Sequence, residues 1–459
     1  MINYLSPRLI SKDLLKRGIG FILISLLLYG HSTTIKTYPY HFDSWDYWDL
    51  ANSFGEKGFA CFNCYPLTIR GYFFPFFLYL IQQSAIFLGI DQFEWFRFIS
   101  VALLSFSSFL VIPFIVNKVF NTPFPLWRSA IFAALIYYLF IGLFYFPLSD
   151  FLSCFLILIS ISFLLSDNVK ITPLALIPAA IAYYCRPIYL APFLIIFIFL
   201  LIRKNWSRKS ILIALMAFSM IFLVSLPQII INRKHHQSFS PLIIDNFYFK
   251  NSLIMAQYRL GISVQKYESY INDKYLFGPL KYYNSTGQSL IQQNDYKSVN
   301  NVSDLFGFYI RYPLDFLSIF MNHAFAGMTI QNPMIYVSNP KNANILLTII
   351  NAGLLTVFFF SLTLRVPFNI RNTLVFTILL VPILFIIPTQ IEERFFLPFF
   401  VFISVWALVN IKQVYFGIKN DPFFKGILFF LVFSLFITER ANLNGLVKEV
   451  PNIYGRIYK

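Results

Sequence analysis

The segment 41–51, HFDSWDYWDLA, places three carboxylates three residues apart, at Asp43, Asp46 and Asp49. On a helix, Asp43 and Asp46 share a face and Tyr47 lies one turn from Asp43. Carboxylates bond sugar hydroxyls and aromatic faces stack on sugar rings, so these residue types suit a sugar-binding site. They equally suit an interfacial helix with Trp anchors and solvated carboxylates. Residue types alone leave both interpretations open.

Three arginines stand at or near the predicted ends of apolar stretches, at Arg70, Arg186 and Arg394. The planar guanidinium pairs well with phosphate oxygens, and an arginine near lipid needs a partner or must reach the interface. All three are therefore candidate phosphate ligands. The competing interpretation is an interfacial anchor or, for Arg394, a salt bridge with the neighbouring Glu392 or Glu393.

Asp150 stands where another apolar stretch begins. A carboxylate at a helix N-terminus is stabilised by the helix dipole, so Asp150 is either a helix cap or a substrate-binding residue. Cys61 and Cys64 form a C-x-x-C pair without a second pair of metal ligands, which predicts no zinc site. Whether these two cysteines are bonded, and whether a divalent metal assists, the sequence leaves open. No cofactor is indicated with certainty.

The composition places the chain in a membrane. Of 459 residues, 58% are hydrophobic and only 12% are charged, whereas soluble domains carry about 25% charged residues. This excludes a soluble enzyme, a disordered tail and a disulfide scaffold. The net charge of +16 indicates positive cytoplasmic loops and contact with membrane lipid; nucleic acid is not an expected partner. The chain also lacks a Gly-rich phosphate loop, which argues against a cytoplasmic nucleotide-sugar donor.

Apolar runs of about 17–25 residues predict the membrane spans. The positive-inside rule requires an even number of spans between neighbouring basic loops. The stretch 72–90 breaks this parity and is predicted to lie at the outer face. The amphipathic segment 305–328 is predicted to lie in the interface plane. About 11 spans remain, with the N-terminus cytoplasmic and the C-terminus external, at 18–36, 95–117, 128–146, 149–165, 171–186, 187–202, 209–231, 343–364, 372–390, 394–411 and 423–438.

This topology divides the chain into three parts. Residues 1–231 form an N-terminal transmembrane module with a first external loop at about 37–94. Residues 232–342 form a polar external loop domain, and residues 343–459 hold the C-terminal transmembrane helices. The predicted fold is all-α and polytopic, with external juxtamembrane helices. Both large polar segments fall on the external face, which predicts that the functional site lies on that face.

Asp43-Ser-Trp-Asp-Tyr47-Trp-Asp-Leu50-Ala51 resembles the D-S-x-x-Y-x-x-L-A signature of GT-C membrane glycosyltransferases. The closest resemblance is to bacterial relatives of the protein O-mannosyltransferases and the lipid A aminoarabinose transferases (glycosyltransferase family 39-like). Further segments resemble motifs of that group in the same order; they begin at Arg70, Leu148, Cys185 and Glu392. The usual Asp-Glu pair is absent, which favours a bacterial envelope branch over a protein-mannosylating one.

The resemblance implies a GT-C fold and an inverting transfer of a sugar from a polyprenyl-phosphate donor. The acceptor would be an envelope glycolipid, as in lipopolysaccharide biosynthesis, or a glycan or protein on the external face of the inner (plasma) membrane. Asp43 would be the catalytic base, with Asp46 as the alternative. The donor phosphate would meet Arg70, Arg186 and Arg394. Further substrate contacts are expected at Tyr47, Asp150 and Glu393.

Two other functions compete with this hypothesis. A polysaccharide flippase or transporter would need charged residues in the middle of its spans, whereas nearly all charges here fall at the ends of apolar stretches. An O-antigen polymerase or ligase also combines many spans with a large external loop, but an early Asp motif is not expected there. A silent assembly subunit would show no transfer with any lipid-linked donor.

Overall fold

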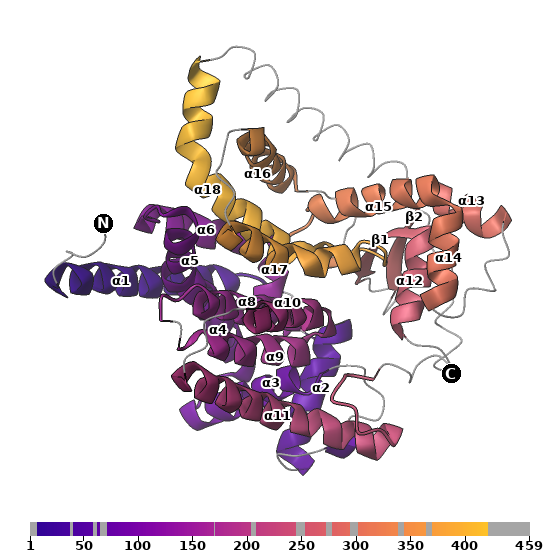
Figure 1. Ribbon diagram of the computed structural model, residues 1–459, viewed down its shortest axis with the longest axis horizontal. Coiled ribbons are helices and arrows are strands. Elements are labelled where there is room, and N and C mark those ends of the chain that lie inside the picture. Colours follow the sequence, from indigo (N-terminus) through magenta and orange to yellow (C-terminus); the bar gives the residue numbers. More distant parts are fainter. Residues whose placement is uncertain are drawn as a thin grey trace.

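A computed structural model describes residues 7–36, 40–57, 62–64, 71–168, 170–202, 208–244, 253–271, 278–293, 302–337, 344–363 and 370–420. This part of the chain is mostly helical, with one small sheet (Figure 1). The helices, in chain order, are α1 (Pro7–Ser32), α2 (Phe42–Lys57), α3 (Phe73–Leu88), α4 (Gln92–Phe106), α5 (Ile112–Phe120), α6 (Leu126–Leu139), α7 (Ile141–Tyr145), α8 (Ser149–Leu164), α9 (Leu176–Cys185), α10 (Leu190–Ile202), α11 (Arg208–His236), α12 (Leu253–Ser263), α13 (Ser285–Gln293), α14 (Val302–Arg311), α15 (Pro313–Met328), α16 (Ile345–Thr363), α17 (Ile370–Ile386) and α18 (Leu397–Asn420). The strands are β1 (Val264–Tyr270), β2 (Gly278–Tyr283) and β3 (Tyr336–Val337).

The apolar helices identify a membrane protein, but they do not reproduce the predicted count of about 11 spans. Within the described residues, 5 helices are long and apolar enough to cross a membrane. Six further apolar helices have only 10–17 residues, and the predicted span 423–438 lies outside the described residues. The five long helices are Lys12–Ser32, Gln92–Phe120, Ile211–His236, Ile345–Leu362 and Glu393–Tyr415.

Most of the missing spans correspond to helices of only 10–17 residues, and one of them is shortened by a break. The predicted span 128–146 is split at Phe140 into α6 and the short α7. There the backbone N–H of Gly142 donates to the carbonyl of Pro333 at 2.9 Å. A Cβ on this glycine would stand 2.6 Å from the backbone nitrogen of Ile335, so only glycine admits this neighbour. A hydropathy window counts apolar residues and does not detect such a break.

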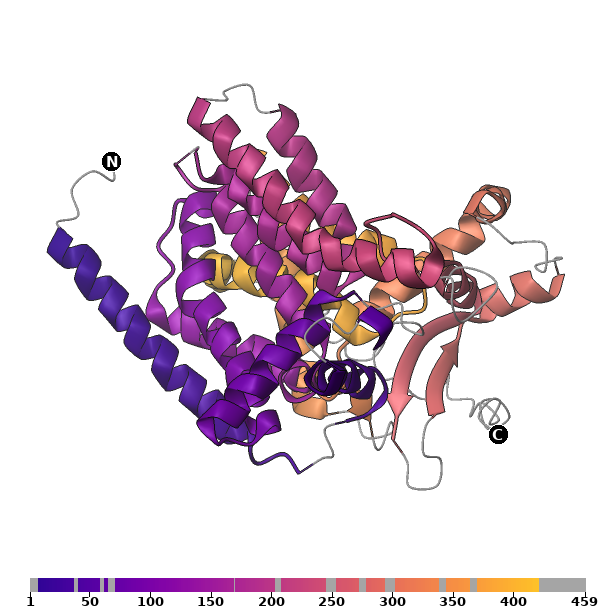
Figure 2. The same cartoon turned by 90° about the horizontal axis from the view of Figure 1, so that it is seen from below.

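The helical bundle packs around one large apolar core. Buried side chains from α4, α6, α8, α9 and α18 form it, together with α16 and α17. Pairs far apart in sequence lie side by side, including α1 with α4, α10 with α17 and α16 with α18. The helix α1 lies at the edge of the bundle in both views (Figures 1 and 2), and only 6% of its apolar window is buried.

The region 253–337 folds as a separate small unit beside the ends of the bundle helices (Figure 1). Its sheet has the order β2-β1-β3, with β1 antiparallel to β2 and parallel to β3. Helices α12, α13, α14 and α15 pack beside the sheet around a second apolar cluster that includes Leu305, Phe308 and Phe316. We call this unit the sheet domain. It falls within the predicted loop domain 232–342, although α11 continues to His236, past the predicted boundary at residue 231.

Candidate functional site

Arg394 is the centre of an ion-pair network that joins four distant parts of the chain. Its Nη2 donates to Oδ2 of Asp43 at 2.7 Å, and its Nε lies 2.5 Å from Oε2 of Glu392. Its Nη1 lies 3.9 Å from Oδ2 of Asp150, and the other oxygen of Asp150 pairs with Arg186. We call these five residues the Arg394 network. It contains three carboxylates and two guanidinium groups.

Helix ends place most of these charges. Asp43 and Asp150 lie in the first turns of α2 and α8, where the positive end of the helix dipole stabilises a carboxylate. Arg186 follows the last residue of α9, where the negative end of the dipole favours a cation. Glu392 immediately precedes the 3₁₀ turn Glu393–Phe396 that leads into α18. The sequence places these charges at helix ends, and the packing of the helices brings the ends together.

The network has a buried interior and a more open rim. The side chains of Arg394 and Asp150 are only 7% and 5% exposed. The side chain of Asp43 is 36% exposed and that of Arg186 is 18% exposed. The Arg186 guanidinium also stacks 4.5 Å from the ring centroid of Phe395, a cation–π contact that holds it in place. An incoming ligand would therefore meet Asp43 and Arg186 first.

Burial and charge alter the proton affinities of the network. Burial raises the pKa of Glu392, and the nearby Asp43 raises it further, while Arg394 acts in the opposite direction. Burial and the positive charge of Arg394 lower the pKa of Arg186 from its ordinary value. Burial thus acts against the charged form of both Arg186 and Glu392.

A second ion cluster surrounds Lys266 on β1. Its Nζ lies 2.7 Å from Oε1 of Glu268 and 2.6 Å from Oε1 of Glu393, and it donates to the side chain of Gln331 at 3.3 Å. Burial lowers the pKa of Lys266, but Glu268 and Glu393 outweigh it and the pKa is raised. All three charged side chains are less than 15% exposed. We call Lys266, Glu268 and Glu393 the Lys266 cluster.

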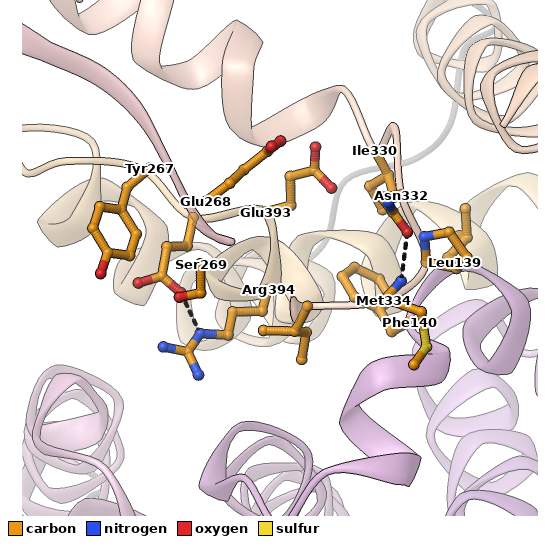
Figure 3. Close-up of a pocket in the computed structure, with 13 residues that line it drawn as sticks. Leu139, Phe140, Tyr267, Glu268, Ser269, Ile330, Asn332, Met334, Glu393 and Arg394 are labelled. Atoms are coloured by element: carbon orange, nitrogen blue, oxygen red, sulfur yellow. Dashed lines mark hydrogen bonds and ion pairs between the residues drawn. The ribbon is translucent and has the colours of Figure 1, made fainter. Parts of the chain in front are cut away.

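Consecutive residues connect the two groups of charges. Glu392 and Arg394 belong to the Arg394 network, whereas Glu393 between them belongs to the Lys266 cluster. Figure 3 shows Glu393 and Arg394 projecting in different directions beside a pocket. This pocket is lined by Tyr267, Glu268 and Ser269 of β1, by residues 139–140, 330 and 332–335, and by residues 392–394.

The sheet domain is fixed to the segment that carries these charges. The N–H of Tyr267 donates to the carbonyl of Ile391 at 2.7 Å, which extends the sheet toward Glu392. His323 on α15 donates from Nδ1 to the carbonyl of Ile387 at 2.6 Å. Gly327 leaves room for the ring of Phe396, because a Cβ at residue 327 would stand 2.1 Å from that ring.

A contact from β3 reaches the first helix of the site. The hydroxyl of Tyr336 accepts from the N–H of Ser44 at 3.2 Å, and the Ser44 hydroxyl accepts from the N–H of His41 at 2.8 Å. These bonds fix the first turn of α2, which carries Asp43. The sheet domain therefore touches both the Asp43 end and the Arg394 end of the network.

Several predicted site residues lie elsewhere. Asp46 is exposed on α2, one helical turn after Asp43. Tyr47 is 7% exposed and packs edge-on against Phe74, with its hydroxyl 3.2 Å from that of Ser149. Tyr47 thus lies beneath the site, beside the residue that precedes Asp150. The predicted substrate residue Glu393 belongs to the Lys266 cluster.

Two predictions fall partly or wholly on parts of the chain that the structure leaves out. Arg70 lies outside the described residues, so its role stays a prediction. Cys61 does as well, but Cys64 is disulfide-bonded, while Cys154 and Cys185 are free. Among the described residues, no group of three or more His, Cys, Asp or Glu side chains could hold a metal ion.

Sequence reasoning missed Lys266, Glu268 and Tyr336. All three lie in the polar region 232–342, where no motif marks them. The alternation in 264–270, VQKYESY, was the one available signal, because it is typical of a strand with two different faces.

No protein-family model matches the sequence, and no curated protein matches it. Any functional assignment therefore rests on the arrangement of the residues described above.

Proposed function

We propose that the protein is an inverting glycosyltransferase that moves a sugar from a polyprenyl-phosphate donor to an envelope acceptor on the external face of the bacterial inner membrane. The observation that carries the proposal is the pairing of Arg394 with Asp43, 351 positions apart in the sequence. Asp150 and Arg186 join the same network from two other segments. A nucleophile-activating carboxylate next to cations is what this transfer needs.

The proposed reaction is a single displacement at the anomeric carbon. An acceptor hydroxyl or amine attacks that carbon, and the bond from the carbon to the phosphate oxygen breaks with inversion. Asp43, the most exposed carboxylate of the network, takes the acceptor proton. Arg186 meets the charge that develops on the departing lipid phosphate. Arg394 and Asp150 are buried and hold these two groups in position.

Each role follows from exposure and charge. A base must reach the acceptor, which favours Asp43 over the buried Asp150 and Glu392. A phosphate ligand must keep unused donors and an open side, which favours Arg186 over Arg394, because Arg394 already faces three carboxylates. The topology with a cytoplasmic N-terminus, and the count of about 11 spans with short helices included, belong to the same proposal.

The test is transfer from a lipid-linked sugar in membranes that contain the full chain. A panel of polyprenyl-phosphate sugars is offered to Asp43→Asn, to the unaltered protein and to the matched control Asp49→Asn, which changes an exposed carboxylate on the same helix. We expect Asp43→Asn to lose roughly a hundredfold or more of the rate and Asp49→Asn to keep it. Equal rates in all three proteins would reject the assignment of Asp43.

The same panel separates this function from its competitors. A flippase would move the lipid-linked sugar across the membrane without transferring the sugar to an acceptor. In that case both the unaltered protein and Asp43→Asn would leave the lipid-linked sugar chemically unchanged. A polymerase or ligase would act on oligosaccharide-bearing lipids and leave monosaccharide donors intact. Asp46→Asn is the further variant, because a loss of rate there and not in Asp43→Asn would move the base by one helical turn.

A further inference from the structure

The helices α14 and α15 carry apolar residues on both sides. One side faces the sheet domain, where Leu305, Phe308, Phe316 and Ile319 are buried in the second apolar cluster. The other side is exposed, with Ile310 at 77% and Leu314 at 79%. The exposed residues, which we call the outer stripe, are Phe306, Ile310, Leu314, Leu317 and Met321.

The outer stripe is a regular feature of the helix surface. In α15, Leu314, Leu317 and Met321 follow the spacing of three and four residues that places side chains on one face. The buried Phe316, Ile319 and His323 (the last 0% exposed) occupy the opposite face. The stripe is therefore exposed in the described part of the sheet domain, and an exposed apolar surface of this kind marks an interaction site.

We propose that the outer stripe lies in the external leaflet of the membrane and anchors the sheet domain to it. The chain after α15 leads into α16, one of the five helices long enough to cross a membrane. The first turns of α16 expose Ile345, Leu346 and Ile349 in the same way. An exposed apolar face on a helix of spanning length that follows α15 along the chain favours lipid over a second copy of the chain.

The direction of α14 agrees with this placement. In Figure 1, α14 runs across the direction of α1. A helix at the ends of the spans that runs across them lies along the membrane surface. Polar residues flank the stripe, among them Arg311 at the end of α14 and the exposed Asn322 on α15. An apolar face with polar flanks is the arrangement of interfacial helices.

The anchor has a consequence for the site. His323 and Gly327, on the protein-facing side of α15, contact Ile387 and Phe396 on either side of Arg394. The helix α15 would then contact the membrane on one side and the segment that carries Arg394 on the other. It would thereby fix the distance of the Arg394 network from the membrane surface. The contact with lipid stands without the proposed transfer reaction, whereas its assignment to the external leaflet rests on the topology of the proposed function.

Spin labelling tests the proposal in the full chain. The variants Leu317→Cys, on the stripe, and Asn322→Cys, on its polar flank, are labelled with a nitroxide. Both are reconstituted in vesicles of phosphatidylethanolamine and phosphatidylglycerol. Oxygen concentrates in the bilayer, whereas a nickel chelate stays in water. We expect oxygen to relax the label at residue 317 more than nickel does, with the reverse order at residue 322.

Two outcomes would overturn the proposal. Stronger relaxation by nickel than by oxygen at both positions would place the stripe in water. Dipolar broadening between labels at residue 317, which disappears on dilution with unlabelled protein, would show that a second copy covers the stripe. The labelled unaltered chain is the background control, because Cys154 and Cys185 are buried. Ile310→Cys against Asp304→Cys repeats the comparison on α14.

Discussion

The Arg394 network and the Lys266 cluster are built from the same residue types but differ in exposure. Both pair basic side chains with an excess of carboxylates, and they share the segment 392–394. The network draws on four distant segments and keeps Asp43 36% exposed. The Lys266 cluster is closed, with no charged side chain above 14%. Partial exposure therefore separates charges that can meet a ligand from charges that hold the fold.

The largest effect is expected at the centre of the network. Arg394→Met would leave three carboxylates, two of them buried, without their shared cation, and removing one partner of a buried pair costs about 5 kcal/mol at the upper end. We expect lower thermal stability in membranes together with loss of transfer. Arg394→Lys is the matched control, because it keeps the charge but loses the planar guanidinium group. Its thermal stability and transfer rate should lie between those of the unaltered protein and Arg394→Met. An unchanged unfolding temperature in Arg394→Met would show that the ion pairs of Arg394 do not stabilise the fold.

The Lys266 cluster should affect stability and spare chemistry. Lys266→Met leaves Glu268 and Glu393 buried without a cation, at a cost of about 3–5 kcal/mol. The double variant Lys266→Met with Glu393→Gln removes a carboxylate as well and should be less destabilised than the sum of the single changes. Transfer per folded molecule should survive in both. A loss of transfer at full stability would place this cluster in the reaction instead.

His323 predicts a pH dependence of the contact between the sheet domain and the bundle. Burial lowers the pKa of His323 from 6.5 to about 4. The unfolded chain therefore binds a proton below about pH 6.5 that the folded form takes up only near pH 4. The stabilisation is complete above pH 6.5 and falls by about 3 kcal/mol as the pH drops toward 4. Unfolding temperatures of the unaltered protein and His323→Asn, measured across this range, should converge at low pH.

The smallest effect is expected at the rim of the network. Arg186→Gln removes one charged hydrogen-bonding group toward a phosphate, so binding of undecaprenyl phosphate should weaken about tenfold, or about 1.4 kcal/mol. Because Arg186 is more exposed than Arg394, we expect a smaller loss of stability than in Arg394→Met. Arg186→Lys should recover part of the binding. Unaltered binding in the Gln variant would leave Arg394 or Arg70 as the phosphate ligand.

The charges at helix ends could be predicted from the sequence. Asp43, Asp150, Arg186 and Arg394 each border an apolar stretch, and a membrane topology brings such borders to a common surface. Their convergence into one network depends on which helices pack together, which hydropathy does not encode. Asp46 is exposed on the same helix, and its predicted role in sugar binding stays a prediction.

The Lys266 cluster and the lengths of the helices could not be predicted. Lys266 meets Glu393 127 positions away, through a sheet whose strands belong to a polar region without motifs. The helix break at Phe140 depends on the approach of Pro333 to Gly142, an event between distant segments. Hydropathy correctly indicated a helical membrane protein and overestimated how many helices have the length of a span.

Successive side chains at residues 392–394 point alternately into the Arg394 network and the Lys266 cluster. Insertions and deletions should therefore be tolerated less well in this segment than substitutions. A conservative replacement alters one partner and leaves the others where they are. The loss or gain of a single residue would instead exchange the two sides, turning an acidic side chain toward the place of the guanidinium and the guanidinium toward Lys266. Homologous chains should therefore vary in residue type along this stretch before they vary in spacing.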